Sequence, residues 1–546
     1  MKGHQAMVRQ QKNDTGMHDS GYGRWVGLAM LSLGVSMIIV DATIVNVATP
    51  AIINELRLDS TITEWVNTTY ALVFAALLIT MGRLGDAFGR RRVLLIGLVV
   101  FMLASVQAGF AGSGPVLIIA RILQGIGGAM MMPASTSIVN TNFRGKDRAL
   151  AFGIWGATIG GMAAVGPLVG GWLTTYSTWR WAFGMNVPLG LLVVAGILAF
   201  VPETRDPSTP PGLDVVGVLL TSLGLGGIVF ALIEGQRYGW LTQDDGSLSP
   251  VPVVLVVGVL LMALFVRRTL ARTRAGRPAL VDLGLLGVRS FRYGSIAALV
   301  VSLGEFGLLF TLPLLLQNAL GFSALQTGWL IVALAVGTFL VSGATPQLTG
   351  RFGARAVVRA GLAIEALAVG ALAVTLTADI AGWEIAGWLF LYGVGVGMAT
   401  AQLTNVILAE IPTAESGQAS GLQSTFRQLG SALGVALLGS LLITTLGHAT
   451  SANLASAGVP APAADTVVSA VTGSAGAVIL ELAAHPATAD AATAAADGLV
   501  TASKVTTGVA AVIIGLGLAA TWTLPYLPPP AAEPRRGTRR TTPSAS

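Results

Sequence analysis

Ionisable side chains that lie inside long apolar runs are the residues of this sequence best able to do chemistry. Asp41, Arg121 and Glu305 each fall within such a run. An ionised side chain at the centre of a bilayer costs about 2.5–3.5 kcal/mol, so it is normally paired, neutralised or functional. A carboxylate in such a place can bind and release a proton, because desolvation favours the neutral acid and a nearby arginine favours the anion. These three residues are therefore candidates for proton coupling.

The overall composition shows why charges inside apolar runs are unusual. Charged residues make up 11% of the 546-residue chain and hydrophobic residues 53%, with a mean hydropathy of +0.74, whereas soluble proteins are about 25% charged. Too few polar side chains remain to cover several soluble domains, so we expect an all-α membrane protein. The net charge of +6 does not indicate a nucleic-acid partner, because the basic residues are dispersed between apolar runs. The chain has no cysteine and four histidines without a metal-binding pair, so we expect no disulfide, metal or cofactor.

The elements that position these charges are predicted to be membrane-spanning helices. Apolar runs of about 20 residues, the length that crosses a bilayer, predict fourteen spans, with both termini in the cytoplasm. In that orientation 26 of the 32 Lys and Arg residues lie in cytoplasmic segments and four in external ones, as the positive-inside rule requires. The spans lie near residues 25–48, 64–82, 93–112, 115–139, 149–174, 181–201, 213–234, 251–267, 293–318, 325–347, 356–377, 384–409, 417–446 and 503–527.

Three segments lie outside this span pattern. Residues 1–24 form a cytoplasmic tail, and the Pro-rich residues 528–546 are predicted to be a disordered cytoplasmic tail. The external segment 447–503 is rich in Ala, Thr, Gly and Ser and contains no Lys or Arg. We interpret it as a mobile or partly helical loop, with a lid or a partner-binding role as the alternative.

The two halves of the chain contain a weak internal repeat. Short motifs of the first half recur in the second half in the same order and at a nearly constant separation, and parallel duplication of a six-helix unit is typical of two-bundle secondary transporters. We therefore predict an N-terminal six-helix bundle over 25–201, a C-terminal bundle over 291–527, and two inserted helices with a cytoplasmic linker over 202–290. The matched motifs are Phe88-Gly89-Arg90-Arg91 with Phe352-Gly353-Ala354-Arg355, Gly125-x-Gly127 with Gly393-x-Gly395, and Ala151-x-Gly153 with Ala419-x-Gly421.

Several of these motifs resemble the major facilitator superfamily over about residues 24–440. The segment from Gly82 to Leu94 is similar to its signature loop, and the segment from Arg121 to Gly125 is similar to its intramembrane arginine motif. Three further segments resemble the fourteen-span drug:proton antiporter branch: Asp41 to Pro50, Gly153 to Gly171, and Trp179 to Phe183 with Asn186. The second-half loop from Gly350 to Arg355 lacks the acid of its first-half counterpart, so a gate there must be weaker or built differently.

This resemblance implies an exporter of lipophilic drugs or antibiotics, driven by protons, in a bacterial cytoplasmic membrane. Its partners would be small amphipathic substrates, protons and the lipid bilayer, and it would act as a monomer. The alternative is an exporter of one endogenous product, such as an antibiotic, lipid or siderophore. A membrane-bound enzyme would need an intramembrane nucleophile or metal cluster, and a sensor would need a soluble signalling domain; the sequence offers neither.

The resemblance also implies a central cavity lined by spans one, four and nine. The helical rise of about 1.5 Å per residue places Asp41, Arg121 and Glu305 in the outer half of the membrane, so they are predicted to form one cluster facing that cavity. Substrate would contact polar and aromatic side chains on its walls. The candidates for the walls are Asn46, Trp65, Tyr70, Gln124, Tyr392, Asn405 and Arg427.

Two of these wall residues have alternative interpretations, and one further acid is interpreted as structural. Trp65 also fits an interfacial belt, and Arg427 also fits a brace within its bundle. Glu365 is assigned a structural role, because its span should be peripheral.

Two motifs are predicted to control movement between the halves. Asp86 and Arg90, with Gly82 and Gly89, are interpreted as a charge latch that closes the inner gate, although the basic run also fits a positive-inside anchor. In span five, Pro167 should kink the helix by removing a backbone hydrogen bond. That glycine-rich motif is either close small-residue packing or a bending contact that prevents leaks; its marked residues are Gly166, Pro167, Gly170 and Gly171.

Overall fold

The computed structural model describes residues 21–58, 60–205, 214–235, 238–242, 247–277 and 279–524. Within the helices a few side chains, including those of Asn46 and Pro167, lie outside the described part. Both predicted tails also lie largely outside it, apart from residues 21–24.

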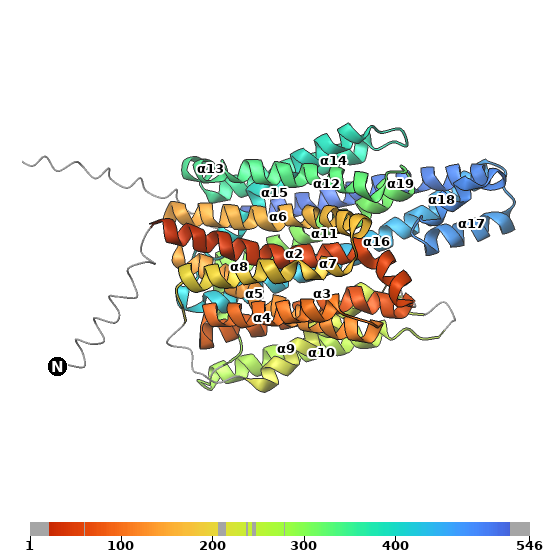
Figure 1. Cartoon of the computed structure of the whole chain (residues 1–546). Helices are drawn as coiled ribbons and strands as arrows, with labels where there is room; N and C mark the ends of the chain where they lie inside the picture. The colour runs from red at the N-terminus through yellow and green to blue at the C-terminus, as the bar shows by residue number, and fades with distance from the viewer. Residues whose placement is uncertain are drawn as a thin grey trace, which may run out of the picture.

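Long helices running up and down one elongated bundle form the fold (Figure 1). Apolar residues throughout each span favour helix, because only a helix satisfies all of its own backbone groups within lipid. In chain order the helices are α2 (Gly21–Leu56), α3 (Ser60–Phe88), α4 (Arg90–Gly109), α5 (Gly114–Asn142), α6 (Gly145–Tyr176), α7 (Arg180–Gly184), α8 (Asn186–Phe200), α9 (Val215–Glu234), α10 (Val251–Arg274), α11 (Arg289–Asn318), α12 (Ala324–Ser342), α13 (Thr345–Phe352), α14 (Ala354–Thr375), α15 (Gly382–Ile407), α16 (Ser416–Ser456), α17 (Ala461–Gly473), α18 (Val478–Ala484) and α19 (Ala489–Ala520), with short 3-10 turns η1 (Leu283–Gly287), η2 (Thr413–Glu415), η3 (Pro486–Thr488) and η4 (Thr521–Thr523).

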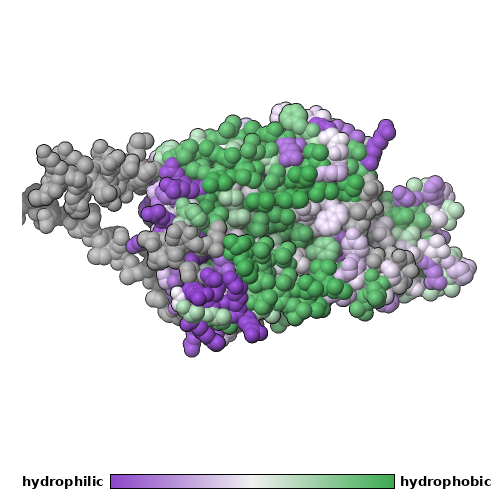
Figure 2. All heavy atoms as spheres, turned by 90° about the horizontal axis from the view of Figure 1, so that it is seen from below, coloured by the Kyte–Doolittle hydropathy of each residue, from purple (hydrophilic) through white to green (hydrophobic). Residues whose placement is uncertain are grey.

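The two ends of the bundle differ. We name the end where the described chain starts at Gly21 and stops at Leu524 the termini face, and the opposite end, which carries α17 and α18, the loop face (Figure 1). A broad apolar belt covers the middle of the molecule, and hydrophilic residues gather at the ends (Figure 2). This distribution is that of a protein surrounded by lipid.

The number of membrane spans is close to the prediction. Thirteen helical segments of the described chain are long and apolar enough to cross a membrane. Helix α6, which coincides with the predicted fifth span, is not one of the thirteen, and several of its side chains lie outside the described part. An all-helical membrane fold is thus confirmed, while the count of fourteen stays a prediction.

The segment predicted to be an external loop is largely helical. Helix α16 continues to Ser456, α17 and α18 follow, and α19 already begins at Ala489. A small core that includes Leu446, Val471 and Leu499 joins these helices. The partly helical interpretation of 447–503 is correct, because enough buried Leu, Val and Ala are present to hold the helices together, and the lid or partner-binding role stays a prediction.

Matched glycines of the internal repeat occupy equivalent places. Gly89 and Gly353 have φ angles of 110° and 83° and precede α4 and α14. Such positive φ angles favour glycine, because a Cβ would be strained there. The repeated motif that contains these glycines therefore marks the same turn in each half.

The inserted helices α9 and α10 are joined to each other by charge. Asp214 caps α9 by accepting the backbone N–H of Gly217, and it forms ion pairs with Arg268 at 2.8 Å and Arg272 at 3.5 Å on α10. Burial raises the pKa of Asp214, but its hydrogen bonds with Arg268 and Gly217 outweigh burial and hold that pKa below its usual value. Helix α9 packs against α3 and α16, one from each half of the chain.

Candidate functional site

A buried polar cluster in the first half of the chain is centred on the carboxylate of Asp41. Asp41 on α2 and Arg121 on α5 are each 1% exposed, and Nη1 of Arg121 lies 2.5 Å from Oδ2 of Asp41. The other oxygen, Oδ1, accepts hydrogen bonds from Nε2 of Gln124 at 2.8 Å and Nδ2 of Asn186 at 3.0 Å. The structure thus brings Asp41 and Arg121 together as the sequence predicts.

The guanidinium of Arg121 is held in place from α3 as well. Its central carbon lies 4.3 Å from the ring centroid of Tyr70, a cation–π geometry, and its Nε donates to the carbonyl oxygen of Val66 at 3.3 Å. The Tyr70 hydroxyl donates to the carbonyl oxygen of Ile38 on α2 at 3.0 Å. A Cβ at Gly125 would lie 2.9 Å from the Tyr70 carbonyl oxygen, so glycine is needed for α5 to approach α3.

Two members of this cluster were not assigned a role from sequence. The Ser105 hydroxyl on α4 accepts hydrogen bonds from Gln124 at 2.9 Å and from Asn186 at 3.2 Å. Asn186 lies in a segment that resembles the antiporter branch, which was the available signal. Ser105 carried none, because a single serine in an apolar helix commonly bonds its own backbone, as Ser105 also does with Phe101 at 2.8 Å.

The arrangement fits an ionised Asp41. One cation and two amides surround its oxygens, which compensates for the loss of water around a buried anion. Removing one partner of a buried pair typically costs about 3–5 kcal/mol.

A second buried ion pair joins the two halves at the termini face. Asp86 at the end of α3 pairs with Arg90 at 2.7 Å. Its carboxylate also accepts the backbone N–H groups of Gly417 at 2.9 Å and Gln418 at 2.7 Å. Both donors lie in the first turn of α16, where unpaired N–H groups and the helix dipole favour an anion. Asp86 therefore connects the first half to the second, in the position predicted for a latch.

Arg90 and a glycine complete this contact between the halves, which we name the latch after its predicted role. The arginine donates to the carbonyl oxygens of Thr413 at 2.8 Å and Ala414 at 2.9 Å, just before α16. A Cβ at Gly82 would collide with the carbonyl oxygen of Gly417. Glycine at position 82 therefore allows α3 and α16 to touch.

The signature segment is a helix junction, as predicted, but the two helices extend further into it than the predicted spans 64–82 and 93–112. Gly82 lies inside α3, which continues to Phe88, and Gly89 alone separates α3 from α4. The correction has a physical cause: a helix can continue past its apolar stretch when charged residues at its end find partners. Arg91 and Arg92 instead donate their backbone N–H groups to Glu203, away from the latch.

The corresponding turn of the second half is built differently, as the missing acid predicted. Arg355 donates to the carbonyl oxygen of Trp522 at 2.8 Å, and Arg359 to that of Thr521 at 3.3 Å. In the described ranges no salt bridge involves this turn. These arginines hold η4, which directly follows α19, rather than the opposite half.

Glu305 belongs to a separate site in the second half. Its Oε1 accepts a hydrogen bond from the Thr400 hydroxyl at 3.3 Å, and it lines a small cavity together with Arg427. That cavity has room for about one water molecule. The expected single cluster with Asp41 and Arg121 is therefore wrong for this conformation, because Glu305 faces α15 and α16 of its own half.

The span-five motif lies on α6 between the halves. A Cβ at Gly166 would collide with the Thr43 hydroxyl on α2, and α6 also packs against α12 and α15. Gly170 is buried and Gly171 half-buried, whereas the side chain of Pro167 lies outside the described part. Helix α6 is continuous from Gly145 to Tyr176. Close small-residue packing is thus present, and the bending function stays a prediction.

The residues predicted to line one substrate cavity are distributed over several places. Tyr70 and Gln124 belong to the Asp41 cluster, and Arg427 lines the Glu305 cavity. Trp65 is half-buried and stacks on Phe230 of α9, with ring centroids 5.9 Å apart.

Two of the remaining three residues lie elsewhere. Tyr392 is 2% exposed inside the second half. Asn405 lies toward the termini face, where its carbonyl oxygen accepts from Arg148 at 3.2 Å and its amide donates to Gln402. The side chain of Asn46 lies outside the described part.

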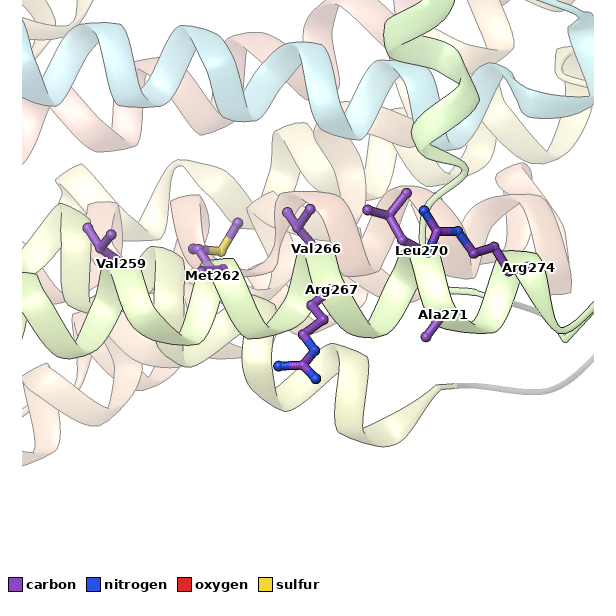
Figure 3. A pocket seen from close by; sticks show the side chains of 8 residues that line it. Val259, Met262, Val266, Arg267, Leu270, Ala271 and Arg274 are labelled. Atoms are coloured by element: carbon purple, nitrogen blue, oxygen red, sulfur yellow. The ribbon is translucent and has the colours of Figure 1, made fainter.

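A shallow groove on the outer face of α10 is unrelated to these clusters. It is lined by Val259, Met262, Val266 and Leu270, with Arg267 and others toward the termini face (Figure 3). Its apolar lining, on a helix at the edge of the bundle, fits a surface that contacts lipid tails.

Comparison with known proteins identifies the family. The model described as Major Facilitator Superfamily matches residues 31–435 and 294–528. The chain is 35% identical over 463 residues to the puromycin resistance protein pur8 of Streptomyces alboniger, covering 82% of this chain and 87% of that protein. It is 34% identical over 418 residues to the multidrug efflux pump LfrA of Mycolicibacterium smegmatis, covering 76% of this chain and 80% of that protein. Its fold is similar to that of the human organic anion transporter MFSD10, with a TM-score of 0.58 at 14% identity, covering 91% and 99% of the two chains. The chain therefore belongs to the major facilitator superfamily.

Proposed function

We propose that the protein exchanges protons for lipophilic drugs or antibiotics across a bacterial cytoplasmic membrane by alternating access. The buried pair of Asp41 and Arg121 carries this proposal, because a carboxylate that one movable cation holds ionised is a proton switch. The named functions of the relatives, puromycin resistance and multidrug efflux, support the substrate class. The superfamily consists of transporters, so no residue is assigned a catalytic role.

The proposed topology has fourteen spans and both termini in the cytoplasm, which makes the termini face the cytoplasmic one. The six-helix bundles would be 25–201 and 291–527, with the inserted helices between them. The latch of Asp86 and Arg90 would then close the inner gate, and this conformation is closed on the cytoplasmic side.

Proton entry would drive export through competition. When Arg121 leaves Asp41, the acid takes a proton from outside, and a substrate that favours the opposite-facing state is released there. The membrane potential adds about 2.3 kcal/mol per charge for each 100 mV. That energy suffices for roughly fiftyfold accumulation, since about 1.4 kcal/mol corresponds to a tenfold ratio.

The test is drug and dye efflux in a bacterial host that lacks its own pumps, with and without a protonophore. The wild type should export several lipophilic compounds, and the protonophore should stop this export. Asp41→Asn should abolish protonophore-sensitive export at equal expression, because an amide carries no proton. The exposed acid Asp379, changed to Asn, is the matched control. Normal protonophore-sensitive export by the Asp41 variant would remove this residue from the mechanism.

A dedicated exporter of one compound is the second candidate. The relative named for resistance to a single antibiotic, puromycin, favours it. The same panel separates the two functions: a multidrug exporter protects against chemically unrelated compounds, whereas a dedicated exporter protects against one.

A further inference from the structure

A buried acid in the second half plays no part in the two ion-pair clusters. Glu365 lies on α14 and is 0% exposed. Both of its carboxylate oxygens lack a hydrogen-bond partner, and within the described residues no cation lies within ion-pair distance of it. Such a side chain requires an explanation, because buried polar groups are nearly always satisfied.

The internal repeat shows which residue this position holds in the first half. There, a Cβ at Gly127 on α5 would lie 2.9 Å from the Cβ of Phe101 on α4. In the second half, a Cβ at Gly395 on α15 would lie 2.5 Å from the Cγ of Glu365 on α14. Glu365 follows Phe101 in the chain by the same offset by which Gly353 follows Gly89 in the repeated turn.

Glu365 thus occupies the place of a fully buried phenyl ring. An apolar residue satisfies the packing there, as Phe101 does at 0% exposure. A carboxyl group adds nothing to packing, and as an unpaired anion it would be strongly destabilising. The surroundings therefore fit a neutral acid that holds a proton in this conformation.

The electrostatic surroundings of Glu365 contain the elements of a proton switch. Glu305 on α11 and Arg427 on α16 act on it through their charges, and Glu365 in turn acts on Tyr392 of the adjacent α15. One arginine can balance only one of the two glutamates. A second positive charge is absent from this part of the described structure, so two ionised glutamates would leave an unbalanced negative charge.

The other helices packed on α14 offer no closer titratable group. Helix α19 meets α14 where Ala511 faces Gly370, so Lys504 lies toward the loop face, roughly 18 Å along the axis from the level of Glu365. At the termini face, Arg355 and Arg359 bond backbone carbonyls of η4. The remaining charged residues on packed elements lie at the helix ends: Arg351 on α13, Glu384 on α15, and Asp490 and Asp497 on α19.

We propose that Glu365 is a second proton-binding residue of the transport cycle, in addition to Asp41. In this conformation one carboxylate oxygen carries the proton. When the second half rearranges and Arg427 approaches, the carboxylate pairs with the arginine and the proton leaves to water. This inference rests on the proposed proton exchange, and it predicts that each cycle moves one proton more than Asp41 alone would carry.

The experiment measures coupling stoichiometry in proteoliposomes. The membrane potential is held at zero with potassium and valinomycin, a pH gradient is imposed, and the ethidium gradient at which net flux reverses is determined. One coupled proton balances a tenfold substrate gradient per pH unit, and two balance about a hundredfold gradient. Net flux through the wild type should reverse at an ethidium gradient of about a hundredfold per pH unit, and net flux through Glu365→Gln at about tenfold. Glu384→Gln, at the end of α15, is the matched control and should behave as the wild type.

The possible results separate this inference from the proposed function. Equal reversal ratios for the wild type and Glu365→Gln would overturn the second proton site and leave proton exchange intact. A wild type without proton-dependent flux would overturn both. Glu365→Phe, which installs the residue of the equivalent position, should fold and also reverse near tenfold.

A second measurement does not depend on transport. Infrared pH-difference spectra of the purified protein report the carbonyl stretch of a protonated carboxylic acid. Glu365→Gln should lose one such band that Glu384→Gln retains. The absolute spectrum of the wild type minus that of Glu365→Gln, recorded at one neutral pH, should contain the same band; its absence would show that Glu365 is ionised and would refute the proposal, even if the variant does not transport.

Discussion

Breaking the latch at the termini face should open that face, and the structure gives the size of the effect. In Asp86→Asn, the new side chain can still accept one backbone N–H of α16, but it loses the second and the charge that holds Arg90. Hydrogen bonds to charged groups contribute about 1.5–3 kcal/mol each. We therefore expect the closed state to lose about 3 kcal/mol relative to the open state, a shift of roughly a hundredfold in their ratio.

The absence of native cysteine makes the assay simple. Ser420 lies on α16 one turn beyond Gly417 and is 0% exposed. A cysteine there should react with a bulky maleimide only when the face opens. In purified protein, Ser420→Cys should be labelled slowly alone and up to about a hundredfold faster together with Asp86→Asn. The exposed Thr413→Cys should be labelled quickly in both backgrounds. Equal rates at Ser420 with and without Asp86→Asn, in folded protein, would refute the latch.

Three further predictions concern the Asp41 pair, the helix contact and the loop face. In an efflux assay, Arg121→Lys should retain part of the efflux with a shifted pH optimum, and Arg121→Ala should retain almost none. If both variants were as active as the wild type, the pair would be excluded from coupling. Gly82→Ala should lower thermal stability by about 1–3 kcal/mol through overpacking against α16, whereas Gly85→Ala, whose Cβ would meet only ordinary contacts, should not; similar melting curves would argue against the contact. The pKa of Glu55 is held below its usual value, mainly by the hydrogen bond from Arg180 and next by that from a tryptophan. The stability that these bonds contribute is therefore present at neutral pH and is lost as the pH falls through that lowered pKa. Glu55→Gln should therefore be less stable than the wild type at neutral pH and nearly equal to it in acid, as measured by thermal unfolding across pH.

The sequence was sufficient for the general architecture. Long apolar runs and scarce charge require membrane helices, since no other local structure satisfies its backbone within lipid. The pairing of Asp41 with Arg121 was also predictable, because two opposite charges at similar depth in a bilayer are strongly driven together. The position of the latch was predictable in the same way, because it contains an acidic residue within a turn of basic residues.

Other features depended on how the helices pack. The depth in the membrane, estimated from the sequence, placed Glu305 with Asp41, but depth says nothing about which way a helix faces. The packing of α11 against α15 and α16 directs Glu305 toward Arg427. Ser105 joined the Asp41 cluster only because α4 lies beside α5.

The contrast is sharpest for Asp86 and Glu365. The sequence by itself determined that Asp86 lies at a helix end among arginines, because hydropathy and charge are properties of the chain. Only the tertiary structure decided that its partners are backbone N–H groups of α16, in the opposite half of the chain. Likewise, sequence places Glu365 deep in a span, but only packing reveals that its carboxylate has no hydrogen-bond partner among the described residues. Hydrophobicity acts on each segment alone, whereas pairing a buried polar group depends on which helices become neighbours.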